Sequence, residues 1–161
     1  MARELIVMWV GRESGGPWSE LCTDYRERIE RWSAVRDVPV RPRGSADRRD
    51  EAERRRLERE AVLSALPEPC ALVALDARGR ARSSESFSSW LQQKQESYPH
   101  PIVFLVGSDA GLDPELRRSS ELQLSFGPMT LPHELARLVL YEQLYRALAI
   151  QHGIKYHRDP F

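Results

Sequence analysis

The stretch PIVFLVGSDAGLDPELRR, residues 101–118, decides the fold class of this chain. Its first six residues form a continuous apolar run, which is typical of a strand covered on both faces of a parallel sheet. A loop bounded by Gly107 and Gly111 follows. Asp113 and Pro114 then indicate a helix start, because aspartate caps a first turn and proline is tolerated at the first helical position. The order of strand, glycine loop and helix predicts an α/β unit.

Strand-like and helix-like segments alternate along the rest of the chain. Further strands are expected at residues 5–10, 35–40, 71–75 and 122–126. Helices are expected at residues 17–32, 46–66, from 83 onward and 132–150, with a polar loop at 76–82. This alternation implies a mostly parallel sheet with helices on both faces. No repeat or linker divides the sequence, so we expect residues 1–161 to form a single domain.

Composition narrows the class of protein. Hydrophobic residues make up 41% and charged residues 30% of the chain, which indicates a globular protein rather than a disordered or membrane-embedded one. The apolar run at residues 5–10 is too short for a signal peptide core or a membrane span. The formal net charge of zero demands no polyanionic partner. Cys22 and Cys70 lack metal spacing, and we expect free thiols in a reducing cytoplasm.

Residues 46–66 are rich in arginine, with Arg54, Arg55 and Arg56 in succession. Guanidinium groups suit bidentate phosphate contacts. Acidic residues are interleaved with them, however, and mixed charges of this kind more often form one solvated helix face. The segment is therefore expected to be an exposed helix with Leu57 on its inner side.

Three glycine-containing loops follow predicted strands, at residues 75–79, 107–111 and 127–131. In an open α/β sheet, ligands bind beyond the carboxyl ends of the strands, and glycine lets a ligand approach the backbone. The sequence has no GxxxxGK[ST], GxGxxG, HExxH or GxSxG motif, and its four histidines show no metal spacing. These loops predict a binding site, but not for a triphosphate, a classical dinucleotide or zinc.

Several motifs in the C-terminal part resemble the ribosomal RNA large-subunit methyltransferase H family of SPOUT methyltransferases. They are VGSDAGL at 106–112, LSF at 124–126, MTLPHELAR at 129–137, EQLYRA at 142–147 and YHR at 156–158. The likeness continues through 74–87 and is weakest in the first seventy residues. Ser108 stands where the family usually has the second of two glycines.

The resemblance implies a fold and an activity. The fold would be an α/β sheet whose C-terminal part is tied in a deep trefoil knot, although knots are rare. The activity would be S-adenosylmethionine-dependent methylation, without a metal, of N3 of a pseudouridine in 23S (large-subunit) ribosomal RNA. The enzyme would be a cytoplasmic homodimer with no membrane association. A chain of zero net charge should bind naked RNA poorly, so we expect the target to be the assembled ribosome.

The resemblance also assigns residues to the site. The methyl donor would be bound by Leu75, Gly107, Phe126, Gly127, Pro128, Met129, Thr130 and Leu131. N3 of pseudouridine is a weakly acidic imide nitrogen, so a base or a group that stabilises the developing anion would help. Candidates for this role are Glu142, Arg146, Tyr156, His157 and Arg158. Two plainer interpretations stay open: an ordinary surface ion pair for Glu142–Arg146, and an inconsequential terminus for 156–158.

Two other functions also stay open. The same fold could bind RNA or the ribosome without catalysis, because fold alone does not secure function. A SPOUT methyltransferase could also act on another RNA, such as tRNA. The helix from Pro132 is expected to form the dimer contact, since Leu140, Tyr141 and Leu144 lie outside its predicted core stripe. That stripe consists of Leu135, Leu138, Val139, Tyr145 and Leu148.

Overall fold

The computed structural model describes residues 3–13, 15–42 and 50–157. In these residues five strands form one parallel sheet in the order β2-β1-β4-β3-β5. The strands are β1 (Leu5–Val10), β2 (Val35–Val40), β3 (Ala71–Ala81), β4 (Ile102–Val106) and β5 (Leu122–Ser125). The helices are α1 (Pro17–Ile29), α2 (Glu51–Ala65), α3 (Ser84–Ser97), α4 (Pro114–Ser119), α5 (His133–Gln151) and the short 3-10 helix η2 (Lys155–His157).

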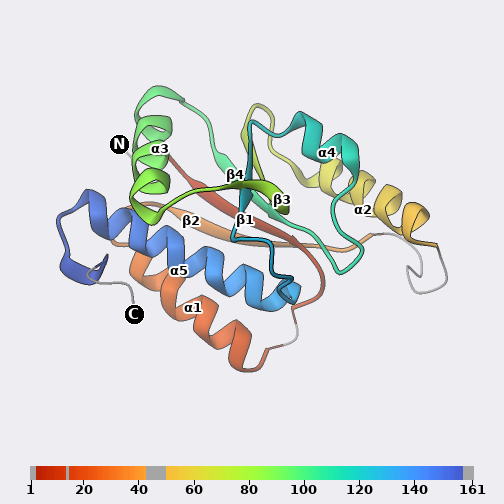
Figure 1. The fold of residues 1–161 in the computed structure, drawn as a ribbon, viewed down its shortest axis with the longest axis horizontal. Helices are drawn as coiled ribbons and strands as arrows, with labels where there is room; N and C mark the ends of the chain where they lie inside the picture. The colour runs from red at the N-terminus through yellow and green to blue at the C-terminus, as the bar shows by residue number, and fades with distance from the viewer. Residues whose placement is uncertain (1–2, 14, 43–49, 158–161) are drawn as a thin grey trace.

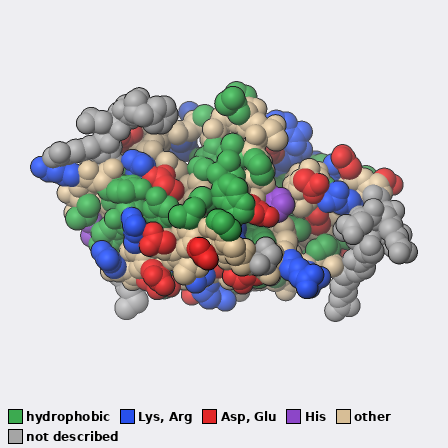
Figure 2. Space-filling model, turned by 90° about the horizontal axis from the view of Figure 1, so that it is seen from below, with side chains coloured by type: hydrophobic (Ala, Val, Ile, Leu, Met, Phe, Trp, Pro, Cys, Tyr) green, Lys and Arg blue, Asp and Glu red, His purple; other side chains and the backbone are tan. Residues whose placement is uncertain are grey.

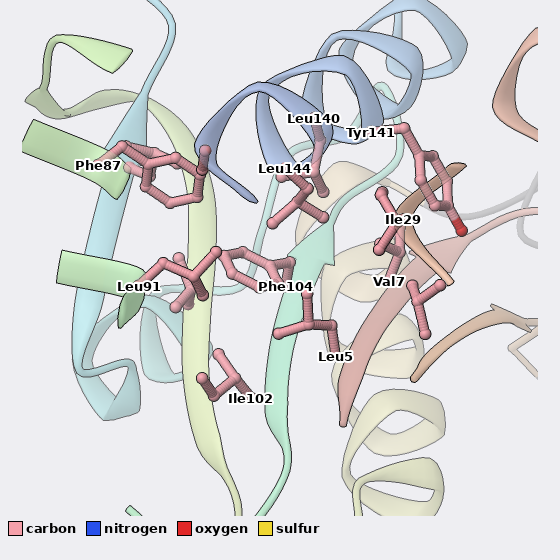
Figure 3. Packing of buried hydrophobic residues seen from close by; sticks show 14 of the residues in the cluster. Leu5, Val7, Ile29, Phe87, Leu91, Ile102, Phe104, Leu140, Tyr141 and Leu144 are labelled. Carbon is pink, nitrogen blue, oxygen red and sulfur yellow. The ribbon is translucent and has the colours of Figure 1, made fainter. Parts of the chain in front are cut away.

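Helices cover both faces of the sheet, as the alternating pattern predicts (Figure 1). All six residues of β1 are buried, and their alternate side chains enter two different cores. Leu5 and Val7 belong to the core under α1, α3 and α5, where Figure 3 shows Leu5 beside Phe104 and Val7 beside Ile29. Met8, on the opposite face, belongs to the smaller core beneath α2 and α4. The α/β prediction with helices on both faces is therefore confirmed.

The predicted polar loop at 76–82 is partly wrong, because β3 runs to Ala81. Both Leu75 and Arg80 pair with Leu124 of β5, so the residues between them bulge out of the ladder. Gly79 allows the strand to return, since a Cβ there would lie 2.5 Å from the backbone oxygen of Gln123. Polarity alone could not distinguish this bulge from a loop.

The predicted core stripe of α5 is partly wrong: Tyr145 and Leu148 are buried as expected, but the rest of the stripe is not. Leu140, Tyr141 and Leu144 are fully buried within the chain, whereas the expected core residues Leu135 and Leu138, together with Val139, are only half-buried. The helix is apolar on several faces, so its periodicity did not reveal which face meets the sheet, α1 and α3.

Local signals fix several helix ends. The Asp113 carboxylate accepts the N–H of Glu115 at 2.9 Å and caps α4 as predicted. The expected end of α1 at Trp32 is wrong: the helix stops at Ile29, whose carbonyl accepts the N–H of Trp32 in a tight turn. In α2, expected at 46–66, the described helix begins at Glu51, and positions 46–49 lie outside the described residues.

Both cysteines are free, as predicted. None of the helices in the described residues combines the length and the apolarity needed to cross a membrane.

Candidate functional site

A cavity of about 650 Å³ lies at the bulge of β3 and the carboxyl ends of β4 and β5. Its volume falls within the range of small-molecule sites, about 300–1,000 Å³. Of the three predicted loops, the first is this bulge, and the second and third follow β4 and β5. Together they form most of the wall, which the first turn of α5 completes. The lining residues are Leu75, Asp76, Ala77, Arg78, Val106, Gly107, Ser108, Asp109, Gly111, Leu112, Leu124, Phe126, Gly127, Met129, Thr130, Leu131, Pro132, His133 and Ala136.

The structure brings the predicted donor-binding residues together around this cavity. Seven of the eight line it: Leu75, Gly107, Phe126, Gly127, Met129, Thr130 and Leu131. Pro128 belongs to the same loop but does not contribute to the wall. Residues separated by more than fifty positions therefore share one site, as expected for loops at one edge of a parallel sheet.

At two glycines the backbone itself forms the wall of the cavity. A Cβ on Gly107 would lie 2.8 Å from Cδ2 of Leu112, so even alanine would crowd the second loop. Gly127 has a φ of 111°, a conformation that side chains disfavour. The Ser125 hydroxyl accepts the N–H of Gly127 at 3.0 Å and lies 3.0 Å from the carbonyl oxygen of Ala77. Ser125 thus ties the third loop to the first.

Asp76 brings a carboxylate to the cavity wall. Its Oδ1 accepts the backbone N–H of Arg78 at 2.9 Å, and its Oδ2 lies 3.2 Å from Nη1 of Arg117. Burial opposes ionisation of Asp76, but Arg78 and Arg117 outweigh it and hold the pKa below its usual value. Asp76 was not among the residues predicted for the site, although its position directly after the apolar run 71–75 was a usable signal.

The second loop is held from outside the cavity by α2. The Ser108 hydroxyl donates to Oε1 of Glu58 at 2.6 Å, and Arg54 lies 2.8 Å from Oδ1 of Asp109. The hydrogen bond from Arg54 lowers the pKa of Asp109. The expectation of a solvated face on α2 is wrong here, because Glu58 is buried and its helix faces the loop. Leu57, expected on the inner side, is half-buried.

Three of the predicted catalytic residues form one network at the other end of α5. Arg146 donates through Nε to Glu142 at 2.9 Å, and the guanidinium carbon lies 4.8 Å from the ring centroid of Tyr156. The Tyr156 hydroxyl donates to Glu142 at 3.2 Å and lies 3.1 Å from the hydroxyl of Tyr25 on α1. Glu142 and Arg146 have side-chain exposures of 20% and 25%, so the pair is partly buried.

Burial, then the hydrogen bonds with Tyr25 and Glu142, raise the pKa of Tyr156. Its phenol is therefore a hydrogen-bond donor near neutral pH and not a base. The side chain of His157 and the whole of Arg158 lie outside the described residues.

The cavity and this network lie apart within one chain. His133 lines the cavity at the first turn of α5, while Arg146 is thirteen residues further along the helix, or about 20 Å at 1.5 Å per residue. Tyr156 packs back on Tyr145, with ring centroids 4.7 Å apart, and not toward its own cavity. Three of the five predicted catalytic residues are thus brought together, but away from the predicted donor site.

Comparisons with known proteins identify the family. A family model described as "Predicted SPOUT methyltransferase" matches residues 4–157. The chain is 40% identical over 157 residues to "Ribosomal RNA large subunit methyltransferase H" of Nitrobacter winogradskyi, covering 96% of this chain and 98% of that protein. It is also 40% identical over 149 residues to the protein of the same name from Rhodospirillum centenum, covering 92% and 95%.

Among solved structures, a "Probable Methyltransferase" from Bordetella pertussis Tohama I superimposes with a TM-score of 0.55 at 15% identity, covering 91% of this chain and 95% of that one. This likeness concerns the fold alone. The family match and the near-complete overlap with the sequence relatives carry the assignment. The chain belongs to the ribosomal RNA large subunit methyltransferase H family of SPOUT methyltransferases.

Proposed function

We propose that this protein transfers a methyl group from S-adenosylmethionine to N3 of a pseudouridine in 23S ribosomal RNA. The cavity at the bulge of β3 and the carboxyl ends of β4 and β5 carries the proposal, because the family's donor-binding positions converge there. The names of the relatives support large-subunit ribosomal RNA as the substrate.

The residues of the cavity fit S-adenosylmethionine. Leu75, Leu112, Leu124, Phe126 and Leu131 offer apolar surface for an adenine ring. The glycines of the second and third loops expose backbone groups that can bind its polar edge. When bound, S-adenosylmethionine supplies an electrophilic methyl group on a sulfonium, and the protein's task is then mainly to position the nucleophile.

We propose that the active site is completed by a second copy of the chain. Within one chain Glu142, Arg146 and Tyr156 are not part of the cavity lining, whereas a homodimer could place one subunit's network at its partner's cavity. Leu140, Tyr141 and Leu144, which were expected at the dimer contact, cannot form it, because they are buried in the core of the single chain.

Another face of α5 supports the dimer instead. Residues 135, 138, 139, 142 and 146 lie at helical spacing and are all half-buried. The stripe is apolar at Leu135, Leu138 and Val139 and polar at Glu142 and Arg146. A partner subunit could therefore pack against the apolar part, while the polar part reaches that subunit's cavity. Figure 2 shows hydrophobic side chains gathered over the face on which α1 and α5 lie.

In this arrangement each group of the network has a defined task. The guanidinium of Arg146 stabilises negative charge that develops on the base when N3 loses its proton. Glu142 holds that guanidinium, and Tyr156 donates a hydrogen bond to Glu142 and presents its ring for stacking. His157 is the proposed proton acceptor, because imidazole changes charge near neutral pH. Arg158 is proposed to contact phosphate.

The proposal includes four further properties. Residues 1–161 would act as one SPOUT methyltransferase domain, with the C-terminal trefoil knot formed by the segments around the cavity. The target would be the assembled ribosome, and the enzyme would be cytoplasmic. A crystal structure with the donor bound would trace both the knot and the subunit arrangement.

Two measurements test the function. Calorimetry should show that S-adenosylmethionine and its demethylated product bind the purified protein. Mass mapping of large-subunit RNA nucleosides should show that cells lacking the protein lose one methyl-pseudouridine. An unchanged methyl-pseudouridine signal would contradict the proposed substrate, and absence of donor binding would contradict the proposed reaction.

A further inference from the structure

Glu58 is a charged residue in an unusual place. It lies in the middle of α2, a helix otherwise covered with exposed ion pairs, yet its relative exposure is only 5%. Its carboxylate faces the second cavity loop and accepts the Ser108 hydroxyl at 2.6 Å. Burying a carboxylate opposes folding unless its partners compensate. Desolvation outweighs those partners here and raises the pKa of Glu58.

Ser108 connects Glu58 to the backbone of the second loop. Its hydroxyl oxygen accepts the backbone N–H of Ala110 at 3.2 Å, and its carbonyl accepts the N–H of Gly111 at 3.0 Å. Gly111 then turns the chain back with a φ of 80°. Ser108 and Gly111 both line the cavity, so the hydroxyl bonded to Glu58 is part of the cavity wall.

Two neighbouring side chains of α2 hold the same loop. Arg54 pairs with Asp109 at 2.8 Å, and Arg55 donates to the carbonyl oxygen of Ala110 at 3.1 Å. Glu58 is one turn after Arg54, so all three contacts come from one side of the helix. Helix α2 therefore contacts three consecutive residues of the loop, 108–110, at the side chains of the first two and the backbone carbonyl of the third.

We infer that Glu58 is a positioning residue of the methyl-donor site, which acts on the donor through Ser108. This inference rests on the proposed function of the cavity. The carboxylate fixes the Ser108 hydroxyl, and this fixes the backbone of 108–111 in the shape that receives the donor. The device suits a loop with Ser108 in place of a second glycine, because serine offers the hydroxyl that glycine lacks.

A double-mutant cycle with two readouts tests this inference. The variants are Glu58→Ala, Ser108→Ala and the double variant, with Glu58→Gln as a milder change and the exposed Glu60→Ala on α2 as the matched control. The first readout, without any ligand, is hydrogen exchange of the amides of Ala110 and Gly111. The second is the affinity for S-adenosyl-L-homocysteine by calorimetry.

We expect Glu58→Ala to speed exchange of both amides and to weaken binding about three- to tenfold, as for the loss of one hydrogen bond. Glu58→Gln should fall between the wild type and Glu58→Ala, and Glu60→Ala should change neither readout. In the Ser108→Ala background, Glu58→Ala should weaken binding less than about twofold further, because the coupled contact is already gone.

Two results would overturn the inference, and a third would overturn the proposed function as well. If the effects of Glu58→Ala and Ser108→Ala multiply, Glu58 does not act through Ser108. If Glu58→Ala and Glu58→Gln leave both exchange and affinity unchanged, the contact has no positioning role. If the wild type does not bind S-adenosyl-L-homocysteine, the proposed function itself fails, and unchanged amide exchange would then separately dismiss the loop contact.

Discussion

Asp37 and Arg137 form a buried ion pair between β2 and α5: Oδ2 of the carboxylate lies 2.7 Å from Nη2, and Oδ1 lies 3.2 Å from Nε. Their side chains are 4% and 8% exposed. The same carboxylate accepts the indole N–H of Trp9 at 2.9 Å and the Tyr141 hydroxyl at 2.5 Å. The guanidinium carbon stands 4.2 Å from the ring of Trp9. One acid thus joins β1, β2 and the helix that closes the cavity.

Asp37→Asn should destabilise the fold by about 3–5 kcal/mol, because it leaves the Arg137 charge buried without its counterion. The measurement is urea unfolding followed by circular dichroism. Asp24→Asn is the control: its partner Arg28 and Asp24 itself are 41% and 51% exposed, so the loss should stay below about 1 kcal/mol. Equal losses in the two variants would show that burial of the Asp37 pair does not matter.

Gly107→Arg should abolish donor binding without unfolding the protein. The new side chain would start 2.8 Å from Leu112 and extend into the cavity, so we expect affinity for S-adenosylmethionine to fall roughly a hundredfold or more. Calorimetry measures the affinity, and circular dichroism checks the fold. Ala65→Arg, at an exposed position near the end of α2, introduces the same side chain away from the cavity and should bind normally. Undiminished binding to Gly107→Arg would place the donor elsewhere.

Tyr156→Phe should slow methyl transfer about tenfold, the value of one hydrogen bond to a charged group, while donor affinity changes less than twofold. The variant keeps the ring but removes the donor to Glu142 and the partner of the Tyr25 hydroxyl. Single-turnover methylation of ribosomes and calorimetry report the two quantities. Tyr98→Phe, outside the network, is the control. A matched fall in donor affinity would assign Tyr156 to donor binding instead.

Glu58→Gln should make stability less dependent on pH. Burial, despite the Ser108 hydrogen bond and the charges of Arg54 and Arg55, raises the pKa of Glu58 above 4.5 in the folded state. The folded protein then holds the proton more tightly than the unfolded chain. The contribution of Glu58 to the free energy of unfolding is therefore fully present below the ordinary glutamate pKa of 4.5, and it is lost as the pH rises through the folded pKa.

Urea unfolding from acidic to neutral pH measures this decline as the difference between wild type and Glu58→Gln. Glu60→Gln, exposed on the same helix, should follow the wild type. A difference between wild type and Glu58→Gln that stays constant with pH would mean that Glu58 titrates alike in both states.

The sequence predicted the sheet and the cavity well because both depend on local patterns. Short apolar runs such as 102–106, bounded by proline and glycine, favour buried strands, and the glycine loops that follow parallel strands meet at one edge of the sheet. Features that depend on contacts between distant segments could not be predicted from local patterns. The inward face of α5 and the role of Glu58 depend on which side chains happen to oppose them, and mixed charges around Glu58 resembled a solvated face.

The separation of Gly107 from Arg146 and Tyr156 leads to the last prediction, which concerns two subunits. If each active site combines one chain's cavity with its partner's tail, Gly107→Arg and a chain truncated after residue 155 should complement each other. Either variant alone should be inactive, because every site would lack its cavity or its tail. The truncation removes Tyr156, whose contacts are with α1 and α5 rather than the core strands, so folding and donor binding should persist.

Co-expression with two different affinity tags would isolate the mixed dimer. Of its two sites, one would carry both defects and the other neither, so the isolated mixed dimer should reach about half the wild-type rate of ribosome methylation. Mixing the purified variants under conditions that block subunit exchange is the control and should give no activity. Activity of the truncated chain alone would show that the tail is dispensable. An inactive mixed dimer, with both variants folded, would mean that cavity and tail must come from the same chain, despite the roughly 20 Å of helix between His133 and Arg146.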